Sequence, residues 1–143
     1  MTILKKLTNF RTINLQALGA ETVLDTKFDL LMSNKEQMRD NLDNEGNSLG
    51  EYLSPSYKRY KLNRGQIGTV DLLNTGAFQN AMRLDLQSRN AYTITSNDSK
   101  TSMLIKKYGN KMFGLNKDSM SEYRSDHFYP DFMPRVKNYL NAE

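Results

Sequence analysis

The chain contains no cysteine and no tryptophan, and its single histidine is His127. Without cysteine it has neither a disulfide framework nor a thiolate metal site. No run of apolar residues approaches the roughly 18 that a membrane-spanning helix requires. The first residues also lack the apolar stretch of a secretory signal. We therefore expect a protein that is made in the cytoplasm and does not enter a membrane.

Apolar residues are also scarce. They make up 38% of the 143 residues, and the mean hydropathy is −0.70. A chain of this length fits one domain, but the composition predicts a core that is either modest or partly supplied by neighbouring molecules. The net charge of +4 favours solubility and is too small to identify a nucleic-acid-binding protein by itself.

Motifs for catalysis and cofactor binding are missing as well. The sequence has no zinc-ligand spacing, no phosphate-binding glycine loop and no nucleophile elbow. His127 is either a general base or a packed or surface residue, and no identifiable nucleophile or carboxylate partner supports the first reading. Residues 41–46 resemble the start of a calcium loop, but its twelfth position is Tyr52 rather than glutamate, which favours a polar turn. We predict no enzyme activity, no cofactor and no metal.

A β-hairpin is predicted at about residues 80–96. Apolar residues at positions 82, 84 and 86 alternate with polar ones, and those at 92 and 94 alternate with threonines. Ser88-Arg89-Asn90 supplies a polar turn between the strands. Upstream, Thr75-Gly76 followed by Phe78 predicts a structural corner, because glycine accepts a positive φ.

Helical patterns precede this hairpin. Residues 1–20 predict an N-terminal arm or a frayed first helix, with Thr2 as its cap. Residues 21–42 predict an amphipathic helix that crosses the sheet and is interrupted at Ser33-Asn34. The residues expected on its buried face are Leu24, Phe28, Leu31, Met38 and Leu42.

Helices are also expected after the hairpin. The first is capped by Asp98 or Ser99 and stops at Gly109. The second is capped by Asn116, and Pro130 either ends or kinks it. A last helix restarts near Asp131. The predicted fold is therefore α+β, with an arm (1–20) and a single domain (21–143). In that domain a small antiparallel sheet is packed by an N-terminal amphipathic helix and C-terminal helices.

A long loop is predicted at residues 43–69, and a loop of this length is unusual in a compact domain and suggests docking. It contains a basic segment with interleaved tyrosines, made of Tyr57, Lys58, Arg59, Tyr60, Lys61 and Arg64. Either the segment tracks phosphates and stacks on bases, or its tyrosines pack inward in a short helix while the lysines extend to solvent. We favour packing, with the exposed bases meeting an acidic protein or DNA.

Three blocks follow one another in the order LDNEGNSLGEYLSPSYKRYK, DLLNTGAFQNAMRL and SNDSKTSMLIKKYGNKMFGLN. In this order they resemble the tailed-bacteriophage family of virion morphogenesis proteins, which includes tail-completion, neck and minor tail proteins. The KYG-x-x-x-FGLN end is similar to variants from phages of Bacteroidetes-type hosts. The matching positions are Asp43, Gly46 and Leu49 in the loop, Tyr57 and Lys61 in the basic segment, and Leu73, Thr75, Gly76 and Phe78 at the corner.

The resemblance implies a structural subunit of the virion that forms a homo-oligomeric ring at the head–tail neck or tail end. Its implied partners are further copies of itself, portal or connector proteins and tail proteins, with DNA in the channel as a further contact. A ring also accounts for the lean core, because each subunit covers apolar surface of its neighbour. The alternative is a nucleic-acid-binding module that uses residues 54–64. A small hydrolase, such as a lytic enzyme, has little support because no paired-carboxylate cleft is identifiable.

Overall fold

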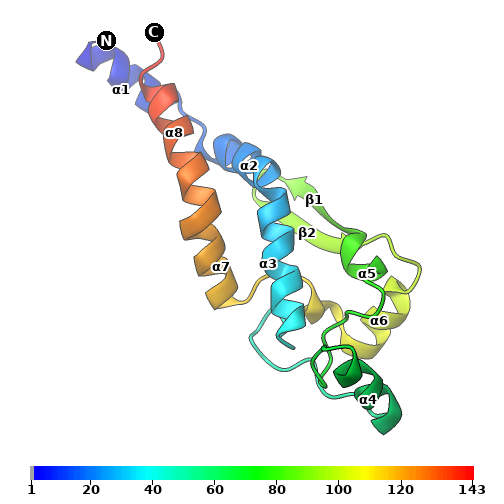
Figure 1. Ribbon diagram of the computed structural model, residues 1–143. Coiled ribbons are helices and arrows are strands. Elements are labelled where there is room, and N and C mark those ends of the chain that lie inside the picture. Colours follow the sequence, from blue (N-terminus) through cyan, green and yellow to red (C-terminus); the bar gives the residue numbers. More distant parts are fainter. Residues whose placement is uncertain (1) are drawn as a thin grey trace.

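The β-hairpin lies where the alternating pattern predicts it. In the computed structural model, which describes residues 2–143, strand β1 (Met82–Ser88) pairs antiparallel with β2 (Ala91–Ser96). Met82 and Ile94 are buried on one face of this two-stranded sheet. Helices pack against the sheet, which confirms the predicted α+β class (Figure 1).

The remaining elements are helices and short helical turns. In chain order they are α1 (Ile3–Thr12), α2 (Leu15–Asp25), α3 (Lys27–Arg39), α4 (Pro55–Asn63), α5 (Ala77–Asn80), α6 (Thr101–Tyr108), the 3₁₀ turn η1 (Asn110–Met112), α7 (Lys117–Tyr123), the π-helical turn η2 (Arg124–Phe128) and α8 (Tyr129–Leu140). The molecule is elongated, with α1 and the end of α8 at one end and α4 at the other (Figure 1).

The predicted interruption of the helix at Ser33-Asn34 is wrong, because the break between α2 and α3 lies at Thr26. Asn34 does not compete for the backbone of its own helix. Its buried side chain instead binds a distant segment: Nδ2 donates to the Met112 carbonyl at 3.2 Å, and Gly114 N–H donates to Oδ1 at 2.9 Å. A side-chain amide engaged in this way leaves the helical hydrogen bonds intact.

The predicted buried face of this helical region is wrong at Leu24 and Phe28, which are both exposed. Leu31 and Met38 are buried as predicted, and the inward side of α3 also carries Leu30, Asn34 and Gln37. Gln37 is buried because it satisfies the backbone after η1, donating to the Gly114 carbonyl and accepting from Asn116 N–H, both at 2.8 Å. A hydrophobic pattern cannot reveal such interior amides, because they are buried for hydrogen bonding rather than for apolarity.

Two helix boundaries after the hairpin are confirmed. Gly109 ends α6 with φ of 81°, and Asn116 caps α7 by accepting the Ser119 N–H at 2.9 Å. Pro130 was predicted to end or kink the helix, and it does not end it, since the helix continues through η2 into α8. Pro130 directly follows the π-helical turn η2, and both proline and a π-bulge interrupt the regular hydrogen-bond ladder of a helix.

The N- and C-terminal helices are tied together by polar side chains. Asn9 Nδ2 donates to three carbonyls at the end of α8, those of Tyr139, Leu140 and Ala142, at 3.2, 3.2 and 2.8 Å. Arg135 joins α8 to α2 through Glu21 at 3.3 Å and through Asp25. The predicted arm therefore begins with a helix, α1, that is attached to the body of the protein. Thr2 caps it by accepting the Lys5 N–H at 3.2 Å.

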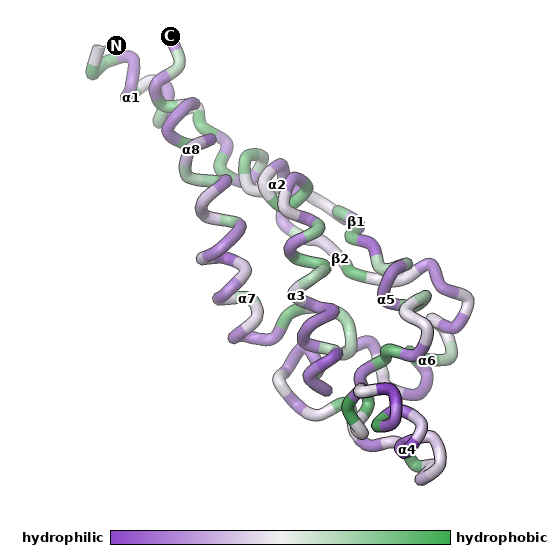
Figure 2. Tube along the Cα trace, viewed as in Figure 1, coloured by the Kyte–Doolittle hydropathy of each residue, from purple (hydrophilic) through white to green (hydrophobic). Residues whose placement is uncertain are grey.

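The apolar core lies around α3, the hairpin and residues 70–82. Along the rest of the chain hydrophobic and hydrophilic positions are interspersed (Figure 2). None of the helices in residues 2–143 is long and apolar enough to cross a membrane. The core residues are Leu30, Leu31, Met38, Val70, Leu72, Phe78, Met82, Ile94, Met112, Phe113 and Tyr123.

Candidate functional site

The predicted loop at residues 43–69 is interrupted by helix α4. Ser54 Oγ accepts the Tyr57 N–H at 3.3 Å, and Pro55 occupies the start of the helix, so the local sequence has a strong helix-start signal. The two ends of the segment are joined by an isolated antiparallel β-bridge between the backbones of Glu51 and Thr69. The segment thus forms a short helical excursion anchored at its base.

The basic segment is divided between the interior and the surface. Lys61 is completely buried, and its Nζ lies 2.7 Å from Asp71 Oδ1 and also donates to the Leu73 carbonyl. The prediction that Lys61 is an exposed docking residue is therefore wrong. A buried ammonium needs a charged partner, and Asp71, only 2% exposed, supplies it.

Asp71 is the centre of a buried hydrogen-bond network. Its Oδ1 also accepts the Tyr52 hydroxyl and the Leu73 N–H, each at 3.0 Å. Burial, together with the Asp71 charge, raises the pKa of the Tyr52 phenol well above its ordinary value, so that the phenol remains a donor to the carboxylate. Gln79, also buried, donates to the Asp71 carbonyl at 3.0 Å and connects the network to α5.

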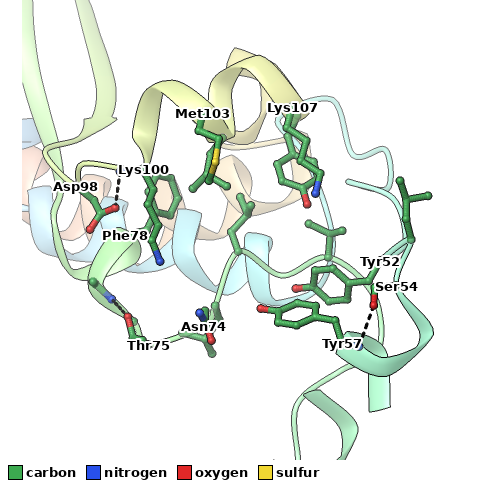
Figure 3. A pocket seen from close by; sticks show the side chains of 18 residues that line it. Tyr52, Ser54, Tyr57, Asn74, Thr75, Phe78, Asp98, Lys100, Met103 and Lys107 are labelled. Atoms are coloured by element: carbon green, nitrogen blue, oxygen red, sulfur yellow. Dashed lines mark hydrogen bonds between the residues drawn. The ribbon is translucent and has the colours of Figure 1, made fainter. Parts of the chain in front are cut away.

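A groove of about 440 Å³ lies beside this network (Figure 3). Tyr52 and Tyr57 line one side, and Met103 and Lys107 of α6 line the other. Its surface is mostly apolar, and Asp98 and Lys100, which directly precede α6, also line it. Residues 72–78 complete the lining between the two sides.

The predicted corner is part of this lining. Gly76 has φ of 88°, the left-handed conformation that the corner requires, immediately before α5. Thr75 Oγ1 accepts the Ala77 N–H at 3.3 Å. Phe78 is buried and packs its ring against Phe113, with centroids 5.9 Å apart. Thr75, Gly76 and Phe78 all line the groove, which brings the corner and Tyr57 together in one place.

The other residues of the basic segment lie at the surface or partly covered. Tyr57 is half-buried and stacks on Tyr60, with centroids 5.8 Å apart. Tyr60 is 45% exposed, and Arg64 lies over its ring at 5.2 Å and donates to its hydroxyl. Lys58 is half-buried and Arg59 is exposed.

The prediction from sequence missed Asp71 and Tyr52. A signal for Asp71 was present, because it is the one charged residue in the apolar run 70–73, and a carboxylate in such a run needs a buried partner. Tyr57 and Lys61 are four residues apart and therefore lie on the same face of α4. For the α6 side of the groove the sequence carries no comparable signal.

The groove does not include the single histidine, His127. This residue lies 3.5 Å from Asp29 on α3 and stacks on Tyr123. Over residues 2–143, no three His, Cys, Asp or Glu side chains are placed to hold a metal ion. No protein-family model, curated protein or solved structure matches this chain.

Proposed function

We propose that this chain is a structural subunit of a bacteriophage virion that forms a homo-oligomeric ring at the head–tail neck or tail end. The observation that carries the proposal is the convergence of two of the three matching motifs, the basic segment and the corner, on one groove. Tyr57 and the corner residues line it, and Lys61 lies buried below with Asp71. The motif residues contribute to this groove through packing and backbone conformation, which supports a structural role.

The loop motif has the same architectural character. Asp43 Oδ1 accepts the N–H groups of Glu45 and Asn47, both at 2.9 Å, and Gly46 takes a positive φ of 83°. Leu49 packs against the core. In a polar turn of this kind the aspartate side chain accepts backbone N–H groups and the glycine adopts the positive φ. These roles support a structural function for the motif.

A neighbouring virion protein fits the groove if it presents an apolar side chain flanked by carboxylates. The groove supplies the tyrosine and methionine contacts that carry binding energy in interfaces. Two ammonium groups, Lys100 and Lys107, outnumber the one carboxylate of the lining, Asp98, and so favour an acidic partner. They would mainly set orientation and encounter rate. We therefore assign the groove to contact with a portal, connector or tail protein rather than with the chain itself.

Nucleic-acid binding through residues 54–64 has less support. Lys61 is buried and paired, and Arg64 is engaged with Tyr60. Lys58, Arg59 and Arg64 are then the remaining accessible bases of the segment, fewer than a phosphate-tracking surface uses. DNA in the channel stays a secondary contact within the proposal.

The proposal is tested by locating the chain in particles produced by the host that encodes it. Gold-labelled antibodies against the chain should bind tailed particles at the neck or the tail end. Met103→Glu, in the groove, should reduce incorporation into particles, whereas Met133→Glu should not, because Met133 is similarly exposed but does not line the groove. Purified particles that contain no trace of the chain would contradict the proposal.

A further inference from the structure

The groove beside α6 carries positive charge at two separate places. Lys100 directly precedes α6 and Lys107 lies in its last turn, with Met103 between them. Figure 3 shows all three side chains on the same side of the helix, extending toward the groove. Seven residues of a helix span about 10 Å. The groove therefore presents two ammonium groups whose backbone positions are this far apart, with an apolar surface between them.

Neither ammonium group is neutralised within residues 2–143. Neither forms a salt bridge with a carboxylate of that part of the chain. Lys107 lies over the ring of Tyr108, 5.3 Å from its centroid, and this contact retains the positive charge. Asp98, the one carboxylate of the lining, accepts the backbone N–H of Lys100 at 2.9 Å. A complementary occupant therefore has to bring carboxylates of its own.

The apolar part of the groove is accessible to such an occupant. Met103 is 58% exposed, and Leu53, next to Tyr52 in the lining, is 93% exposed. Leu72 also lines the groove and has φ of 56°, a left-handed conformation that a leucine rarely adopts. Strained residues of this kind cluster at ligand-binding surfaces. Apolar side chains of a partner would cover the exposed methionine and leucine.

The exposed apolar faces of this chain do not have the complementary charge. The face of α1 is apolar and exposed, but no acidic residue precedes Glu21 in the sequence. On α3, Phe28 is exposed, but Lys27 lies over its ring at 5.4 Å and the adjacent Asp29 already contacts His127. The charge pattern of the groove therefore selects another protein rather than a second copy.

We infer that the groove binds an amphipathic helix of a neighbouring protein. This helix carries two carboxylates seven residues apart, with apolar residues three and four positions after the first. These four positions lie on one face of a helix, and the acids are separated by the same distance of about 10 Å as Lys100 and Lys107. In an extended segment the side chains of one face are about 7 or about 13 Å apart, so the lysine spacing favours a helix. The inference rests on the proposed function only for the identification of the neighbour as a virion protein.

The test uses a fluorescently labelled, alanine-based peptide of about 20 residues, long enough to form a helix in water. It carries two glutamates seven residues apart and leucines three and four positions after the first. Fluorescence anisotropy with the full chain should show saturable binding that weakens with salt. Lys100→Glu/Lys107→Glu should weaken this binding at least about tenfold, and should bind a peptide in which lysines replace the glutamates. Lys106→Glu, exposed on α6 but outside the groove, should leave the binding unchanged.

Circular dichroism establishes that the variants fold. Absence of binding, or binding that does not follow the exchange of charges, would overturn the inference. Equal binding of a peptide interrupted by prolines would assign the groove to an extended segment instead. Displacement of the peptide by a DNA oligonucleotide, or by self-association of the chain, would also overturn the inference. Charge-dependent binding with no chain in virions would leave this contact standing and remove the virion function, whereas a chain located at the neck without such binding would do the reverse.

Discussion

Replacing Lys61 by methionine should destabilise the fold by about 3–5 kcal/mol, the usual cost of leaving a buried charge unpaired. The methionine side chain replaces most of the apolar part of the lysine side chain, so the main loss is the ammonium group. Asp71, 2% exposed, would then keep the Tyr52 hydroxyl and the Leu73 N–H as donors but lose its only charged partner. For 143 residues this corresponds to a fall in Tm of roughly 10–15 °C.

The measurement is urea unfolding followed by circular dichroism. Arg59→Met on the same helix is the matched control, because Arg59 is exposed and should change stability by no more than about 0.5 kcal/mol. The double variant Lys61→Met/Asp71→Asn should recover part of the loss, since it removes the unpaired charge. If the free energy of unfolding of Lys61→Met were less than about 1 kcal/mol below that of the parent, the idea that Lys61 and Asp71 form a water-excluded pair, each needing the other, would be refuted.

Three further predictions follow from the groove. Gly76→Val should lower stability by about 1–2 kcal/mol, because a β-carbon disfavours its φ of 88°, and an unchanged Tm would contradict the corner. Tyr52→Phe should reduce the loss of folding stability that occurs above pH about 10. Folding raises the pKa of the Tyr52 phenol, so the contribution of Tyr52 to stability is complete below its pKa in the unfolded chain and declines as the pH rises further. An identical pH profile for the variant would disprove that contribution. Replacing Tyr57 and Tyr60 by alanine should block incorporation into virions. Replacing the accessible bases Lys58, Arg59 and Arg64 by glutamine should only slow incorporation, more so at low salt. The reverse ranking would favour nucleic-acid binding.

The hairpin and several helix caps were predictable because their signals are local. Met82 and Ile94 alternate with polar neighbours, and Gly109 and Asn116 act on the backbone within a few residues of themselves. Position 37 was not predictable in this way, since Gln37 is buried to satisfy a segment almost 80 residues away.

The same limit applies to the candidate site. Gly76 was identified because its role is conformational, and that role is visible in the local sequence. Lys61 was assigned to the surface because lysine usually lies there. Only the fold brings it to Asp71, ten residues further along the chain. Sequence reasoning identified the groove's corner and one tyrosine, but not the network beneath them.

The attachment of α1 by Asn9 also sets an order of events during synthesis. Its acceptor carbonyls lie 130–133 residues further along the chain, so the ribosome must complete almost the whole protein before they exist. Until then the Asn9 side chain lacks these three acceptors. Closing a loop of this length is also entropically costly. The contact between α1 and α8 is therefore formed last, after the other elements of the fold have been synthesised.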